Sequence, residues 1–350
     1  MHQRHRRLSG LLKVLLAGGL LAWLFERGVI DFKTLAISLG QPLVVVSAAL
    51  LLILAYALSA LRWKILLGTQ GITHSSGQLL RVVFIGQFLN NVLPIGGAGG
   101  DAFRIAYVLK NDIGHRASAV LSIIVDRVMG LYGLIIVASA MILIEWRLVL
   151  SQDLLLIMAG GVISALFGMP IALPMLHRML KGPSISSLMG KFRFVPSGHE
   201  WVMLLDQSLI RYRRHVREAV LALLISISIH SIILLSFIML AGKGEWTLQG
   251  LSATLAWLSN LIPVTPGGLG IGEAVFDQIF RWGTDGTFAG YGTLFLAHRT
   301  LLVVTTLPGI IFLFVGKQPA ADIHNVAGQY LIESQNDLIP ARKAPISPGS

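Results

Sequence analysis

The chain has 350 residues, of which 54% are apolar and only 13% charged, and its mean hydropathy is +0.74. A soluble domain usually carries about twice that share of charge, so the composition excludes an ordinary soluble protein. The absence of cysteine excludes disulfides and thiolate metal sites. The net charge of +11 does not indicate nucleic acid, because the basic residues lie between apolar runs and not along a soluble face.

The apolar residues form long runs, and about 20 of them in a helix span a bilayer. In chain order, the runs predict six spans at residues 11–25, 43–61, 117–144, 154–176, 219–242 and 287–316. The first run is followed by Glu26-Arg27-Gly28, which is not a small-residue cleavage site, so we expect an anchor and not a signal peptide.

The basic residues predict the orientation of these spans. With the N-terminus inside, 21 Lys and Arg residues fall on the cytoplasmic side and 5 on the outer side. The positive-inside rule therefore favours two cytoplasmic termini in a bacterial-type inner membrane. A basic cytoplasmic loop (177–218) and a polar cytoplasmic tail (317–350) would flank a membrane domain within residues 1–316.

Two further uncharged stretches, residues 82–100 and 246–272, contain Pro and Gly clusters through which a helix cannot continue. Broken backbone survives in lipid only when it is buried in protein or lines a wet cavity. We therefore predict two re-entrant or broken helices.

The two stretches share an ordered pattern. Each has an Asn-x-x-Pro element (residues 91–94 and 260–263), then a Gly-rich turn, then an acid followed by alanine, then an arginine inside a span. The acids are Asp101 and Glu273, and the arginines are Arg127 and Arg299. Given the predicted topology, the pattern indicates an inverted repeat with halves at about 41–146 and 219–316, which is typical of transport proteins.

These motifs resemble the lysylphosphatidylglycerol synthase transmembrane family, also called the flippase-like domain family. The resemblance is carried by Phe88 to Pro94, Gly99 to Arg104, Asp126-Arg127, and Pro266-Gly267-Gly268-Leu269-Gly270-Ile271-Gly272-Glu273. It covers roughly residues 10–316 and implies lipid translocation, although it does not identify the lipid. The short tail after Gly316 leaves no room for a synthase domain, so the resemblance implies a stand-alone member.

Arg127 and Arg299 are the foremost candidate residues, because a charge within a span usually faces a cavity or a partner. They could grip a phosphate, or they could form structural ion pairs with Asp101, Asp126 or Glu273. Asp126 and Arg127 point about 100° apart on a helix, so we expect each to have a different partner.

The acids after the Gly turns, Asp101 and Glu273, could cap helices, couple protons or contact a cationic headgroup. Three asparagines, Asn90, Asn91 and Asn260, could bind a headgroup or satisfy broken backbone. His230 is expected to be a hydrogen-bonded core residue. The predicted substrate-binding residues are Arg127, Arg299, Asp126, Asp101, Glu273, Asn91, Asn260 and Arg104.

The sequence therefore predicts an all-α integral membrane protein with about six transmembrane helices and two re-entrant helices. Its predicted function is the translocation of a phospholipid, anionic or aminoacylated, without enzymatic activity or a cofactor. Two alternatives stay open. One is a membrane scaffold for a lipid-synthesis or glycosyl-transfer enzyme, and the other is a membrane enzyme with an acid/base carboxylate. A homo-oligomer or a lipid-synthesis partner is also compatible with the sequence.

Overall fold

The computed structural model describes residues 40–92, 98–111, 115–180, 211–212, 214–242, 244–262, 265, 268–284 and 291–315, and these contain helices and no strand. Five of the helical segments are long and apolar enough to cross a membrane. They are Pro42–Thr69, Ser118–Ile144, Asp153–Ile171, Val216–Ala241 and Gly292–Leu313. They coincide with five of the predicted spans, whereas the sixth, at residues 11–25, lies outside the described residues.

The first half contains α3 (Pro42–Thr69), α4 (Ser76–Val92), α5 (Ala98–Asn111) and α6 (Arg116–Ile144). The second contains α11 (Val216–Ala241), α12 (Trp246–Ser259), α13 (Ile271–Gly283) and α14 (Gly292–Thr306), which α15 (Pro308–Val315) continues. Each half thus consists of a span, two shorter helices and another span. In chain order α7 (Trp146–Ser151) and α8 (Asp153–Leu180) come between the two halves. Helix α8 packs along α6.

The two predicted broken segments are interrupted helices. In the first half α4 packs against α5, and in the second α12 packs against α13. The interruptions coincide with the Pro and Gly clusters, because proline lacks the backbone donor and glycine has a low helix propensity. We call these two helix pairs the first and second hairpins.

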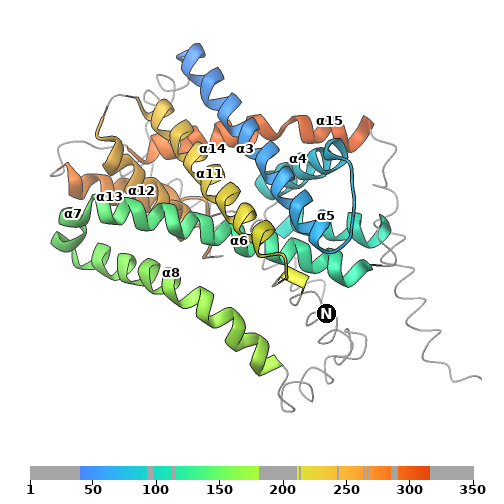
Figure 1. Ribbon diagram of the computed structural model, residues 1–350. Coiled ribbons are helices and arrows are strands. Elements are labelled where there is room, and N and C mark those ends of the chain that lie inside the picture. The colour runs from blue at the N-terminus through green and yellow to red at the C-terminus, as the bar shows by residue number, and fades with distance from the viewer. Residues whose placement is uncertain are drawn as a thin grey trace, which may run out of the picture.

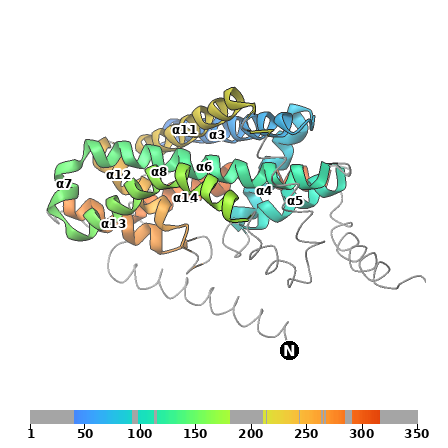
Figure 2. The ribbon, with the colours of Figure 1, turned by 60° about the horizontal axis from the view of Figure 1, so that its bottom comes forward.

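The contacts of one half repeat in the other. Helix α3 packs against its counterpart α11, while α12 packs on α6 and α4 packs on α14 and α15. The first helix of each hairpin therefore lies against the last span of the opposite half. The hairpins lie at opposite ends of the bundle, α4 and α5 at one end and α12 and α13 at the other (Figures 1 and 2). The inverted orientation of the halves stays a prediction.

The halves meet where small residues allow close approach. A Cβ on Gly133 of α6 would lie 2.7 Å from Cβ of Ser226 on α11, so no larger residue fits there. Such small-residue contacts are typical of helix packing in membranes, where there is little hydrophobic drive for association.

The described end of the basic loop is tied to α3. Arg211 donates a hydrogen bond to the Gln70 carbonyl over 3.2 Å, and Tyr212 donates to the Leu66 carbonyl over 3.3 Å. Burial raises the pKa of Tyr212 to about 12, so the hydroxyl stays protonated at neutral pH. The rest of the loop and the tail at 317–350 lie outside the described residues.

Candidate functional site

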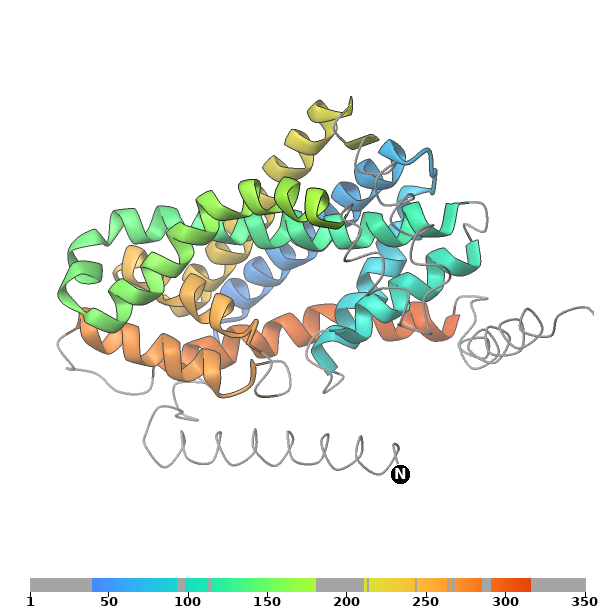
Figure 3. The same cartoon turned by 90° about the horizontal axis from the view of Figure 1, so that it is seen from below.

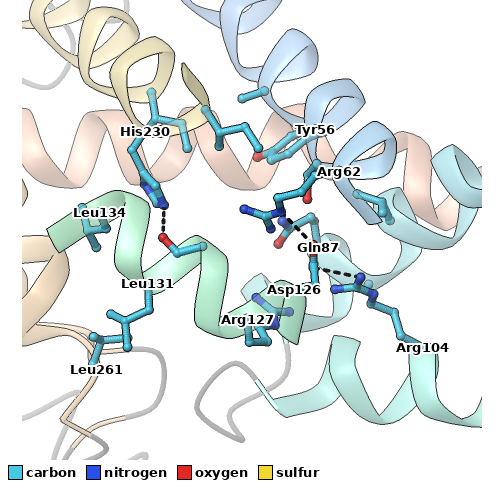
Figure 4. A pocket seen from close by; sticks show the side chains of 17 residues that line it. Tyr56, Arg62, Gln87, Arg104, Asp126, Arg127, Leu131, Leu134, His230 and Leu261 are labelled. Carbon is cyan, nitrogen blue, oxygen red and sulfur yellow. Dashed lines mark hydrogen bonds and ion pairs between the residues drawn. The ribbon is translucent and has the colours of Figure 1, made fainter. Parts of the chain in front are cut away.

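A cavity of about 360 Å³ lies between the two halves. Its walls come from α3, α4, α5, α6 and α11, and Leu261 reaches it from the turn after α12. Polar and charged residues line one part, and apolar side chains line most of the rest (Figure 4). The polar group comprises Tyr56, Ser59, Arg62, Gln87, Arg104, Asp126, Arg127 and His230.

Asp126 is the centre of the charged part. Arg62 Nε donates to its Oδ1 over 2.7 Å, and Arg104 Nη2 donates to its Oδ2 over 2.9 Å. Figure 4 shows the two guanidinium groups reaching the carboxylate from α3 and from α5. All three residues are buried, so charge-assisted hydrogen bonds hold the cluster in a setting that screens charge poorly.

The cluster also joins the halves and stacks on an aromatic ring. Arg62 Nη1 donates to Ser226 Oγ on α11 over 2.8 Å. The Arg104 guanidinium carbon lies 4.1 Å from the centre of the Trp63 ring, which is a cation–π distance. These contacts fix the direction of both arginines.

Arg127 and Asp101 form an ion pair beside this cluster. The Arg127 side chain is 44% exposed and also lines the cavity. The second half contains the corresponding pair, in which Arg299 Nη1 lies 3.2 Å from Glu273 Oε1. Acid and arginine are 26 residues apart in both cases. Asp126 and Arg127 therefore have different partners, as their helical positions predicted.

Glu273 also caps α13. Its Oε2 accepts a hydrogen bond from the Gly270 N–H over 2.8 Å, and its carboxylate is completely buried. This is the helix-capping interpretation of the acid, and it coexists with the ion pair. Arg299 and Glu273 are not among the residues that line the cavity.

The asparagines pack against the Gly-rich turns. Asn90 accepts a hydrogen bond from the Gly100 N–H over 2.7 Å, which is the expected role of an asparagine at broken backbone, while Asn91 is exposed. Asn260 packs so closely on Gly272 that a Cβ there would lie 2.6 Å from its Oδ1. The Asn90 contact satisfies backbone, whereas the Asn260 contact is close packing, and the buried Asn260 Oδ1 accepts no hydrogen bond from the described part of the chain. His230 hydrogen-bonds the Gly130 carbonyl over 2.9 Å, as predicted, but it is partly buried and lines the cavity and is therefore not a core residue.

The second half has aromatic residues where the first has its charged cluster. His298 precedes Arg299 as Asp126 precedes Arg127, and Phe276 stands three residues after Glu273 as Arg104 stands after Asp101. The Phe237 ring lies 5.2 Å from Phe276 and 5.3 Å from His298, measured between centroids. Among the described residues, the second half therefore has no counterpart of the Arg62–Asp126–Arg104 cluster.

Arg62 is not among the residues that the sequence predicted for the site, because it follows the predicted span at 43–61 and so falls in a predicted cytoplasmic loop. Helix α3 in fact continues to Thr69. The signal was present in the apolar residues Trp63, Ile65, Leu66 and Leu67, which continue the helix past the arginine.

The fold and the cavity define a multi-pass, all-α membrane protein with a charged internal site. The model of the family described as the lysylphosphatidylglycerol synthase TM region matches residues 10–309. The chain belongs to this family, which confirms the resemblance and links the protein to lipid metabolism.

Two relatives are both UPF0104 membrane proteins. The first, PH1989 of Pyrococcus horikoshii, is 28% identical over 291 residues, which cover 75% of this chain and 86% of the relative. The second, MJ1595 of Methanocaldococcus jannaschii, is 30% identical over 89 residues, or 25% of this chain and 26% of the relative. No solved structure matches the chain significantly.

Proposed function

We propose that the protein translocates a phospholipid, or a modified phospholipid, between the leaflets of a bacterial-type inner membrane. The observation that carries this proposal is the cavity between the halves, which combines a guanidinium cluster with apolar walls. A lipid has the same two parts, a charged headgroup and an apolar body. Membership of a family named for a lipid-synthesis enzyme supports the same substrate class.

In this proposal the headgroup enters the polar part of the cavity while the acyl chains stay in the bilayer. Arg127 would make the first contact, because it is half-exposed and lines the cavity. Its pairing with Asp101 would open when lipid arrives, so that phosphate replaces the carboxylate as its partner.

Alternating access would come from rocking of one half against the other. The placement of the hairpins at opposite ends of the bundle supports this, since an inverted repeat has one hairpin near each membrane surface (Figure 3). The pairs Asp101–Arg127 and Glu273–Arg299 would hold each hairpin against the last span of its own half.

The proposal is tested by lipid scrambling in proteoliposomes that contain headgroup-labelled phospholipids. Wild-type protein is expected to move label across the bilayer. Arg127→Ala should slow it at least about tenfold because it removes the first contact for the phosphate, and Arg299→Ala should do so because it removes the pair that would hold α13 against α14. Arg281→Ala is the matched control. It breaks an ion pair of 2.5 Å with Asp277 that lies within α13, joins no two helices and does not line the cavity, so it should leave the rate unchanged.

If the folded wild-type protein moves no anionic, zwitterionic or lysylated lipid, the translocase proposal is wrong. A search for a partner enzyme would then follow, because the scaffold alternative requires one.

A further inference from the structure

The charged part of the cavity has one positive charge more than its carboxylates neutralise. Arg62 and Arg104 share the single carboxylate of Asp126. Asp101 pairs with Arg127, and its Oδ1 also lies 4.0 Å from Arg104 Nη1, so two carboxylates face three arginines. The group of Arg62, Arg104, Arg127, Asp101 and Asp126 therefore carries a net charge of +1.

Burial makes this excess charge unfavourable. The Arg62 and Arg104 side chains are 7% and 5% exposed, and a buried charge without a counter-charge is strongly destabilised because it has lost its hydration. Moreover, Nε of Arg104 is buried without a hydrogen-bond partner. A bound anion would supply both the missing counter-charge and a hydrogen-bond acceptor for this Nε.

The cavity also leaves room for an anion at Arg62. The hydrogen bonds of this residue use Nε and Nη1, which leaves Nη2 for a ligand. Gly130 stands opposite, and a Cβ there would lie 3.3 Å from Nη1 and 3.5 Å from Nη2. The missing side chain therefore keeps the face of the guanidinium open.

We propose that the Arg62–Asp126–Arg104 cluster binds the single negative charge of a lipid phosphodiester and thereby selects monoanionic headgroups. The inference rests on the proposed function, whose lipid it specifies. One phosphodiester charge brings the cluster to neutrality. A phosphomonoester dianion would give it a net negative charge, and an uncharged lipid would leave its positive charge unbalanced. A soluble phosphodiester has the same charge, but the apolar walls of the cavity favour the lipid.

The test is calorimetric titration of the purified full-length chain in nonionic detergent at pH 8 with short-chain lipids. Dihexanoyl phosphatidylglycerol should bind at least about tenfold more tightly than dihexanoylglycerol, which lacks the phosphodiester. It should also bind more tightly than dihexanoyl phosphatidate, most of which carries a second negative charge at this pH.

Two variants test the site itself. Arg62→Gln leaves a neutral Arg104–Asp126 pair, so it should weaken phosphatidylglycerol binding at least about tenfold and remove the preference over dihexanoylglycerol. Gly130→Ala keeps every charge and crowds the Arg62 guanidinium, and it should weaken the same ligand. Lys64→Gln is the matched control, because it removes one charge from α3 at an exposed position away from the cavity.

Equal affinities for phosphatidylglycerol and dihexanoylglycerol would overturn the inference, as would full binding by both variants. Dimethyl phosphate that binds as tightly as the lipid would overturn the lipid assignment in favour of a soluble anion. The failures are distinguishable. Scrambling without charge selection would support the translocase proposal and contradict this inference. Charge-selective binding without scrambling would support this inference and contradict the translocase proposal.

Discussion

At the scale of residues, Asp126 is the acceptor on which the cavity depends. Its two oxygens accept hydrogen bonds from Arg62 and from Arg104, and its side chain is 1% exposed. A carboxylate used in this way is poorly suited to act as a general base, because both oxygens are already bonded to cations. Its position therefore favours binding over acid/base chemistry.

Replacement of Asp126 by alanine should destabilise the protein strongly. Two buried guanidinium groups would lose their shared partner, and removal of one partner from a buried ion pair costs about 3–5 kcal/mol. Thermal unfolding in detergent would show this as a large fall in the midpoint. Asp153→Asn is the control, because that acid is exposed in the first turn of α8 and its loss should change stability by less than about 1 kcal/mol. Equal midpoints for the two variants would contradict the role assigned to Asp126.

Residue partners were only partly predictable from the sequence. Equal spacing of acid and arginine in the two halves predicted related roles for Arg127 and Arg299, and each is found with the acid of its own half. Arg62 could not be paired with Asp126 by spacing, because 64 residues separate them and only the packing of α3 on α6 brings them together.

At the scale of elements, the first hairpin depends on a contact between two helices that is too close to admit a side chain. A Cβ on Gly100 would lie 2.0 Å from the backbone carbonyl oxygen of Gly86, so α4 and α5 touch backbone to backbone at this point. The adjacent Asn90 accepts from the Gly100 N–H. The Pro and Gly clusters predicted where the helices break, but a close approach between two helices leaves no periodic signal in the sequence.

Gly100→Ala should therefore separate α4 from α5 and destabilise the protein by about 1–3 kcal/mol, as overpacking does in cores. Gly77→Ala in α4 is the opposite case, because a Cβ at this position would meet nothing within 4 Å outside its own turn of helix, and alanine favours a helix. That variant should be neutral or more stable by up to about 1 kcal/mol. Unfolding midpoints of both variants in the same detergent provide the comparison. A Gly100→Ala protein as stable as Gly77→Ala would show that the hairpin contact is looser than described.

At the scale of the whole molecule, run length and the ordered motifs predicted the fold class well. The five described spans follow the apolar runs, because a bilayer requires helices of about 20 residues whose backbone hydrogen bonds are satisfied internally. What the sequence could not provide is the exchange of contacts between halves, in which α12 packs on α6 and α4 on α14. The cavity itself lies where α11 and the turn after α12 meet the helices of the first half.

The orientation of the molecule gives the last prediction. Of the 21 basic residues assigned inside, Arg62 and Arg104 lie in the cavity, which leaves 19 inside against 5 outside, so the membrane potential and anionic headgroups should still retain the 177–218 loop in the cytoplasm. The chain has no cysteine, so a single cysteine reports one position without background. Ser197→Cys in this loop should react with a membrane-impermeant maleimide only after the cells are opened. Ser151→Cys, at the exposed end of α7, should react in intact cells. The reverse pattern would invert the topology and, with it, the leaflet that each hairpin faces, while the pairing of the two halves would stay as it is.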